Sequence, residues 1–121
     1  MKTLREVLEL INSCGDWFEM PATSANQQGA YADYPLHKVA HWGDVEAARV
    51  LLDNGADIDA VGEDEETPLL RAILGRKTEM IKFLLSRGAD LNPKDIYGKT
   101  ALDAARVWGN QDIYLAILRK V

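Results

Sequence analysis

The stretch Tyr34-Pro35-Leu36-His37 decides the fold, because it returns 33 residues later as Thr67-Pro68-Leu69-Leu70 and 33 residues after that as Thr100-Ala101-Leu102-Asp103. Gly55 and Gly88 keep the same spacing of 33 residues. A fixed period of this length, kept over three copies, is typical of solenoids in which each repeat is one small structural unit. We therefore predict an all-α solenoid of stacked helix–loop–helix units.

Each unit carries the signals of two short helices. In the first repeat, proline is tolerated in the opening turn of a helix predicted over residues 35–42, and Gly43 is suited to end it. A second helix is predicted over 45–53, with apolar residues along one stripe and Gly55 as its cap. One such pair leaves an apolar face in water, so neighbouring pairs must stack to bury it.

These residues resemble the ankyrin-repeat family, and the small size of the chain resembles ankyrin-repeat proteins of bacterial type. The motifs that carry the resemblance lie at residues 34–40 and 51–59, and with their copies they cover residues 34–121. The resemblance implies a curved stack with short β-hairpin-like fingers, and a protein that binds other proteins rather than catalysing a reaction. Arg76 and Glu65 replace turn glycines of the pattern, so we expect less regular turns at both positions.

We divide the single domain, residues 1–121, into a capping helix (1–15), an extended loop (16–33), two repeats (34–66 and 67–99) and a C-terminal capping repeat (100–121). The loop is seven residues longer than the link between the first two repeats, and it contains Trp17 and Phe18. These aromatic residues would either seal the end of the core or contact a partner, and the sequence leaves both alternatives open.

Composition excludes several classes of protein. The chain has 14 basic and 19 acidic residues, a net charge of −5, which argues against general nucleic-acid binding. No apolar run approaches the ~18 residues of a membrane-spanning helix. A single cysteine cannot form an internal disulfide or a multi-cysteine zinc site. We therefore expect a cytoplasmic protein without cofactors that is a monomer when free and binds neither nucleic acid nor membranes.

Histidine offers the only hint of catalysis or metal binding, and the hint is weak. His37 and His41 are four residues apart, which is the spacing of a helical metal-binding pair, but no third ligand accompanies them. In ankyrin-like repeats the residue at the position of His37 typically bonds neighbouring backbone. No glycine-rich phosphate-binding motif occurs, so we predict no enzymatic activity and no metal site.

A partner would contact the side chains that the stack does not need. In ankyrin-like repeats these lie on the finger tips and near the ends of the first helices. We predict that the binding residues are His41, Trp42, Leu74, Val107 and Trp108 on the helices, and Tyr31, Asp33, Glu63, Asp64, Glu65, Glu66, Tyr97 and Lys99 on the fingers. Trp42 and Trp108 share one phase of the repeat, with Gly75 between them. Each tryptophan either contributes to binding or folds over its own turn.

Charge is unevenly distributed, with a net charge of −7 over residues 34–66 and +4 over residues 67–99. The acidic run Glu63–Glu66 at a finger tip would favour a basic partner, although such a run can also be a merely solvated surface. The function that we predict is a non-catalytic protein–protein interaction module that uses its concave face. The alternative is an immunity or inhibitor protein that neutralises a basic toxin enzyme.

Overall fold

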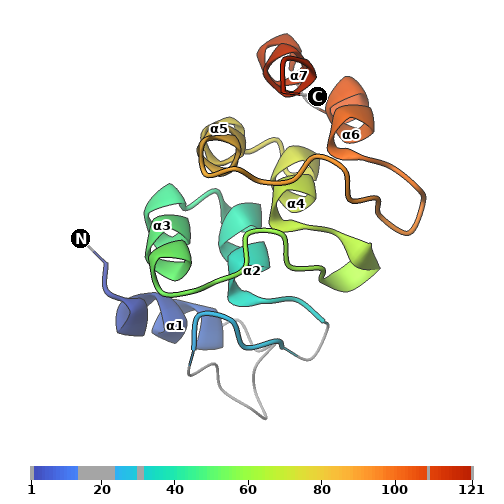
Figure 1. The fold of residues 1–121 in the computed structure, drawn as a ribbon. Coiled ribbons are helices and arrows are strands. Elements are labelled where there is room, and N and C mark those ends of the chain that lie inside the picture. Colours follow the sequence, from blue (N-terminus) through green and yellow to red (C-terminus); the bar gives the residue numbers. More distant parts are fainter. Residues whose placement is uncertain (1, 14–23, 30–31, 109, 121) are drawn as a thin grey trace.

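The structure is a computed structural model that describes residues 2–13, 24–29, 32–108 and 110–120 (Figure 1). Within these residues the secondary structure is helical, and there is no strand. The helices of the first repeat, α2 (Pro35–Trp42) and α3 (Val45–Asp53), have the predicted bounds. The predicted all-α solenoid is therefore confirmed.

The helices form two rows that run along the stack (Figure 1). The inner row consists of α2, α4 (Pro68–Leu74) and α6 (Ala101–Trp108). The outer row consists of α1 (Leu4–Asn12), α3, α5 (Thr78–Ser86) and α7 (Gln111–Leu118). The core lies between the rows, and its largest fully buried side chains include Leu36, Leu51, Leu69, Ile73, Met80 and Leu84. Stacking therefore buries the apolar stripes, as the repeat pattern requires.

The turn between the two helices of a repeat keeps the same backbone conformation with two different residues. Gly43 ends α2 in the left-handed conformation, with φ of 77°, and Arg76 takes the equivalent position with φ of 57°. A left-handed non-glycine residue costs roughly 1–2 kcal/mol. The expected irregularity at Arg76 is therefore strain in the backbone rather than a different turn.

The fingers are three copies of one tight loop, each closed by a backbone hydrogen bond. The N–H groups of Gly29, Gly62 and Asp95 donate to the carbonyl oxygens of Asp33, Glu66 and Lys99 over 2.7, 2.9 and 3.0 Å. The residue before each of these carbonyls has a positive φ, of 68° at Ala32, 57° at Glu65 and 75° at Gly98. The doubt about a tight turn at Glu65 was wrong, because the turn forms and Glu65 adopts the left-handed conformation.

The middle finger also contains a short 3-10 helix, η1 (Glu63–Glu65), and a second left-handed residue, Asp64 with φ of 58°. This finger reaches its neighbour, because the Asp64 carbonyl accepts a hydrogen bond of 3.0 Å from the N–H of Ile96 on the third finger. The second and third fingers are therefore joined at their tips.

Candidate functional site

An ion-pair network anchors the first two fingers to the inner row. Arg71 of α4 donates hydrogen bonds to both carboxylate oxygens of Asp33, from Nη1 to Oδ2 over 2.9 Å and from Nη2 to Oδ1 over 3.0 Å. Its Nε donates to Oε1 of Glu66 over 2.7 Å. Oδ1 of Asp33 also accepts the N–H of Glu63 over 3.0 Å. One guanidinium group therefore positions two consecutive fingers.

The charges of this network are matched despite their burial. Burial raises the pKa of Asp33, but the hydrogen bonds from Arg71 and from the N–H of Glu63 more than offset it, so the pKa lies below its ordinary value. Burial raises the pKa of Glu66, Arg71 opposes that change, and the nearby carboxylates Asp64 and Asp95 raise it further. Asp33 is thus ionised at neutral pH, while Glu66 lies in an acidic surrounding.

His37 belongs to the same framework. Its Nδ1 accepts the N–H of Tyr34 over 3.0 Å, and its Nε2 lies 2.8 Å from the carbonyl oxygen of Glu66, to which it donates in the tautomer that this pairing requires. Burial lowers the pKa of His37, so the ring is neutral at pH 7. Both ring nitrogens bond backbone, as the resemblance implied, and neither is available to a metal ion.

Metal binding gains no support elsewhere in the part of the chain that the structure describes. His41 is exposed on α2, one turn beyond His37. Among the described residues, no group of three or more histidine, cysteine, aspartate or glutamate side chains could hold a metal ion.

The expectation that Asp33 lies on an exposed, partner-binding tip was wrong. Only 2% of its surface is exposed, because the finger folds back onto Arg71. Sequence reasoning also missed Arg71 and Gly62. A charged residue inside the apolar run of α4 was the available signal, since a buried charge requires a partner.

A hollow of about 380 Å³ lies between the third finger and the ends of α4 and α6. Its lining includes Glu66, Leu74, Tyr97, Lys99, Val107 and Trp108, all of which were predicted from the sequence. Tyr97 is 75% exposed, Val107 69% and Trp108 45%. The fold therefore gathers six of the predicted binding residues around one depression, and it leaves large apolar side chains in solvent there.

Trp108 forms a wall between this hollow and a second one of about 350 Å³. The second hollow is lined by Arg76, Ile81 and Asn110, among others. The guanidinium carbon of Arg76 lies 5.6 Å from the centre of the Trp108 ring, in a cation–π contact. Arg76 thus covers part of the ring while the rest remains accessible.

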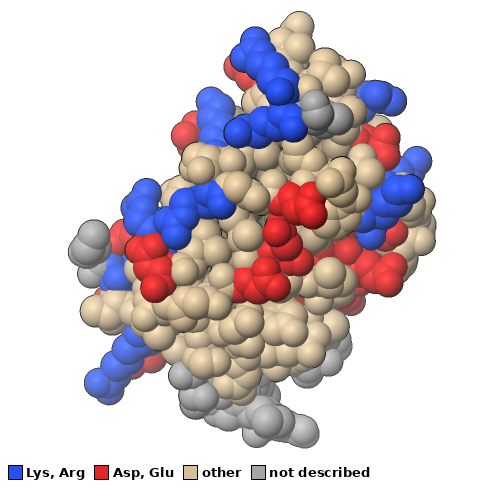
Figure 2. All heavy atoms as spheres, viewed as in Figure 1, with Lys and Arg blue, Asp and Glu red and all other residues tan. Residues whose placement is uncertain are grey.

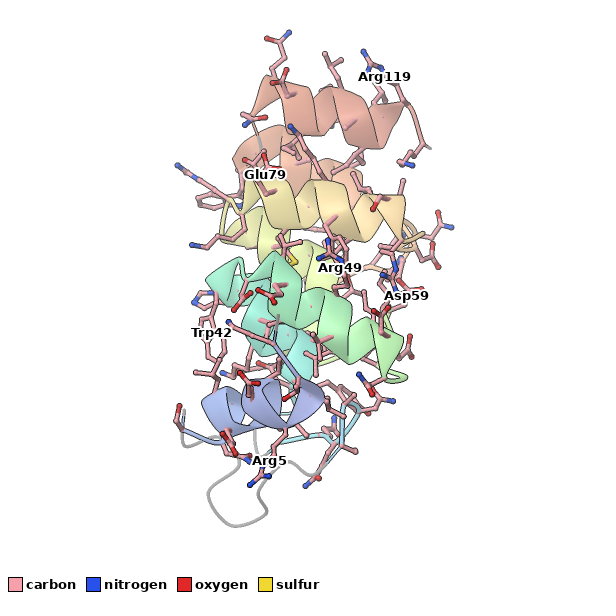
Figure 3. All side chains as sticks on the ribbon, turned by 90° about the vertical axis from the view of Figure 1, so that its left-hand side faces the viewer. Arg5, Trp42, Arg49, Asp59, Glu79 and Arg119 are labelled. Atoms are coloured by element: carbon pink, nitrogen blue, oxygen red, sulfur yellow. The ribbon has the colours of Figure 1, made fainter. Side chains whose placement is uncertain are left out.

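Trp42 lies apart from both hollows. It is 40% exposed and projects at the edge of the stack opposite to Asp59 (Figure 3). Gly75, which we expected to be the floor between the two tryptophans, lies against the side chain of Lys77; a Cβ atom at Gly75 would be 3.6 Å from Cγ of Lys77. Tyr31, Trp17 and Phe18 lie outside the described residues, so their predicted roles stay predictions.

The acidic side chains Glu63, Asp64 and Glu65 are exposed on the middle finger. Figure 2 shows carboxylates gathered over the side of the molecule where Figure 1 places the fingers, with basic groups next to them. Glu66 differs from its neighbours, because it is partly buried in its pair with Arg71. The acidic tip therefore borders the hollow without being used by the internal network.

Comparison with known proteins identifies the family. The family description "Ankyrin repeats (3 copies)" matches residues 5–95 and 36–120, so the chain belongs to the ankyrin-repeat family. The mouse B-cell lymphoma 3 protein homolog is 38% identical over 71 residues, which are 58% of this chain and 16% of that protein. The *Caenorhabditis elegans* BRCA1-associated RING domain protein 1 is 34% identical over 73 residues, 60% of this chain and 10% of that protein.

Mouse Rabankyrin-5 is 32% identical over 87 residues, which are 71% of this chain and 7% of that protein. This chain therefore spans less than a fifth of the length of these relatives. They give no support to the predicted bacterial type. Ankyrin repeats are protein–protein interaction modules, and that is the level of function that the family defines. Within the described residues, every helix is too short or too polar to cross a membrane.

Proposed function

We propose that the chain is a non-catalytic module that binds another protein through its finger face, the surface formed by Leu74, Tyr97, Lys99, Val107 and Trp108. This surface corresponds to the concave side of the stack, between the fingers and the inner row. The observation that carries the proposal is the exposure of Tyr97, Val107 and Trp108 around one hollow. Clustered apolar side chains in solvent are costly unless a partner covers them.

The framework beneath this face supports the same function. Arg71 and His37 tie the first two fingers to each other and to the inner helices, and the Asp64–Ile96 hydrogen bond joins the third finger to them. A surface that is ordered before binding loses little conformational entropy when a partner docks. Exposed tyrosine and tryptophan are also the side chains that most often dominate binding energy.

A matched pair of variants tests this proposal. Val107→Asp places a charge at the end of α6 on the finger face, whereas Leu118→Asp places the same charge at the end of α7, on a side chain that is also exposed (43%). Both proteins are checked for folding by circular dichroism and then used for affinity capture from the native cell lysate. A stoichiometric partner retained by wild type and Leu118→Asp but lost by Val107→Asp supports the proposal. A partner retained or lost by both variants contradicts it.

The finer parts of the function remain proposals as well. We propose that the protein is a monomer when free, acts in the cytoplasm and binds no nucleic acid. The toxin-inhibitor alternative has no observation of its own beyond the acidic middle finger, and it stays a hypothesis.

A further inference from the structure

The hollow on the finger face has an apolar floor. Leu74, Ala104, Val107 and Trp108 come from the ends of two neighbouring inner helices, and Tyr97 closes the side toward the fingers. A volume of about 380 Å³ lies at the lower end of the range for ligand-binding pockets, roughly 300–1,000 Å³. This size suits one or two apolar side chains of a partner segment rather than a folded surface.

The end of the hollow toward the middle finger is acidic. Glu66 and Asp95 line it, and the exposed carboxylates of Glu63, Asp64 and Glu65 adjoin it through the hydrogen bond between Asp64 and Ile96. Arg71 is the cation bonded within this group, and it is already shared between Asp33 and Glu66. The raised pKa of Glu66 is consistent with this surplus of negative charge, since Asp64 and Asp95 both contribute to it.

The end of the hollow toward the C-terminal repeat carries cations. Lys99 and Arg106 both line the hollow and both are exposed. The pKa of Asp103 is lowered first by hydrogen bonds from Thr100 and also by the charges of Lys99 and Arg106, which places both cations near this end. The hollow is therefore polar along the axis of the stack, negative toward the second repeat and positive toward the third.

We infer that the hollow receives a peptide segment in which an apolar residue has a basic residue on one side and an acidic or neutral residue on the other. The apolar side chain would contact Leu74, Val107 and Trp108, and the basic residue would face the carboxylates of the middle finger. A segment that was basic on both sides would meet like charge at Lys99 and Arg106, which is destabilising. This inference rests on the proposed function and specifies the chemistry of the partner.

Selection from a phage-displayed library of random peptides tests the inference without knowledge of the natural partner. The wild-type protein should enrich peptides with an aromatic or aliphatic residue and with lysine or arginine on one side only. Purified peptides should bind at least tenfold more weakly to Trp108→Ala, because tryptophan side chains frequently contribute that much or more at interfaces.

Charge reversal supplies the specific control. The double variant Glu63→Lys, Glu65→Lys should lose the preference for basic residues. The double variant Glu79→Lys, Asp112→Lys makes the same change in net charge at exposed sites on the outer helices, and it should keep that preference. The contrast separates a local effect of the finger from a change in the overall charge of the protein.

Three outcomes would overturn the inference. These are enrichment of peptides without a one-sided basic preference, retention of that preference by the finger variant, and no enrichment at all. Loss of the natural partner through Val107→Asp would still support the proposed function in any of these cases. The two proposals can therefore fail separately.

Discussion

Arg71 and Asp33 are 38 positions apart in sequence, yet they form a bidentate ion pair that is almost completely shielded from solvent. The pair joins the first finger to the helix of the next repeat, and it lets the same guanidinium bond Glu66 of the second finger. A planar guanidinium suits this task, because it offers parallel donors to one carboxylate and a further donor to another.

Replacement of Arg71 by methionine should therefore destabilise the protein by about 3 kcal/mol, because Asp33 would be left buried without its main partner. Urea denaturation followed by circular dichroism measures the loss. Arg87→Met is the matched control, since Arg87 pairs with Asp53 over 3.0 Å on the exposed outer face, where a pair contributes about 1 kcal/mol or less. Equal losses in the two variants would contradict the role given to the buried pair.

Stability should fall as the pH decreases below about 6.5. The pKa of His37 lies below 6.5 in the folded protein, so the unfolded chain binds more protons in this range and acid favours unfolding. The depressed pKa values of Asp33 and Asp44 act only at lower pH, below the ordinary value of 3.8. The raised pKa of Glu66 has the opposite sign, and its effect begins above 4.5.

The unfolding free energy, measured from pH 7.5 to 5.5, should therefore decrease for wild type and for His41→Gln. His37→Gln should lower stability at pH 7.5 but flatten the pH dependence. A slope that persists in His37→Gln and disappears in His41→Gln would assign the effect to the wrong histidine.

Glu65→Gly should stabilise the protein by about 0.5–1 kcal/mol. Glu65 has a φ of 57°, a conformation that costs a non-glycine residue roughly 1–2 kcal/mol, and part of this gain is offset by the greater freedom of glycine when unfolded. Glu63→Gly removes the same charge from a residue without a positive φ, so it should be neutral or destabilising. Thermal denaturation compares the two, and a destabilised Glu65→Gly would contradict the argument.

Gly62 should be far less tolerant of alanine than Gly88. A Cβ atom at Gly62 would lie 2.5 Å from Oδ1 of Asp33 and 2.8 Å from Nε2 of His37, so it would disrupt the buried network by several kcal/mol. At Gly88 nothing lies within 4 Å of an added Cβ, and the cost is confined to the strain of a φ of 84°. Denaturation curves of the two variants should differ clearly, and similar midpoints would rule out this close packing.

The helices and the phase of the finger face could be predicted from the sequence, because the period of 33 residues repeats the local signals that specify them. The hollow is an example, since Leu74 and Val107 are equivalent positions of consecutive repeats and must lie side by side in a stack. Long-range pairing could not be predicted in this way. Asp33 was expected at an exposed tip because the repeat pattern contains no information about its partner Arg71.

Backbone strain was the second limit. Glu65 and Arg76 stand where glycine is favoured, and sequence reasoning took this as a sign of irregular turns. Both positions nevertheless adopt positive φ, because closing hydrogen bonds such as the one between Gly62 and Glu66 hold the turn. The surrounding structure overrides the local preference of these residues.

Site-specific photo-crosslinking in the native cell tests the central claim, that the finger face binds a protein, most directly. A photoreactive phenylalanine derivative would replace Val107 or Tyr97 on the finger face, and Arg49 or Leu118 on the outer row as controls (Figure 3). We predict a single cross-linked partner from positions 107 and 97 and none from 49 and 118. Cross-links from the outer positions alone, or none from the finger face of a folded protein, would contradict the account.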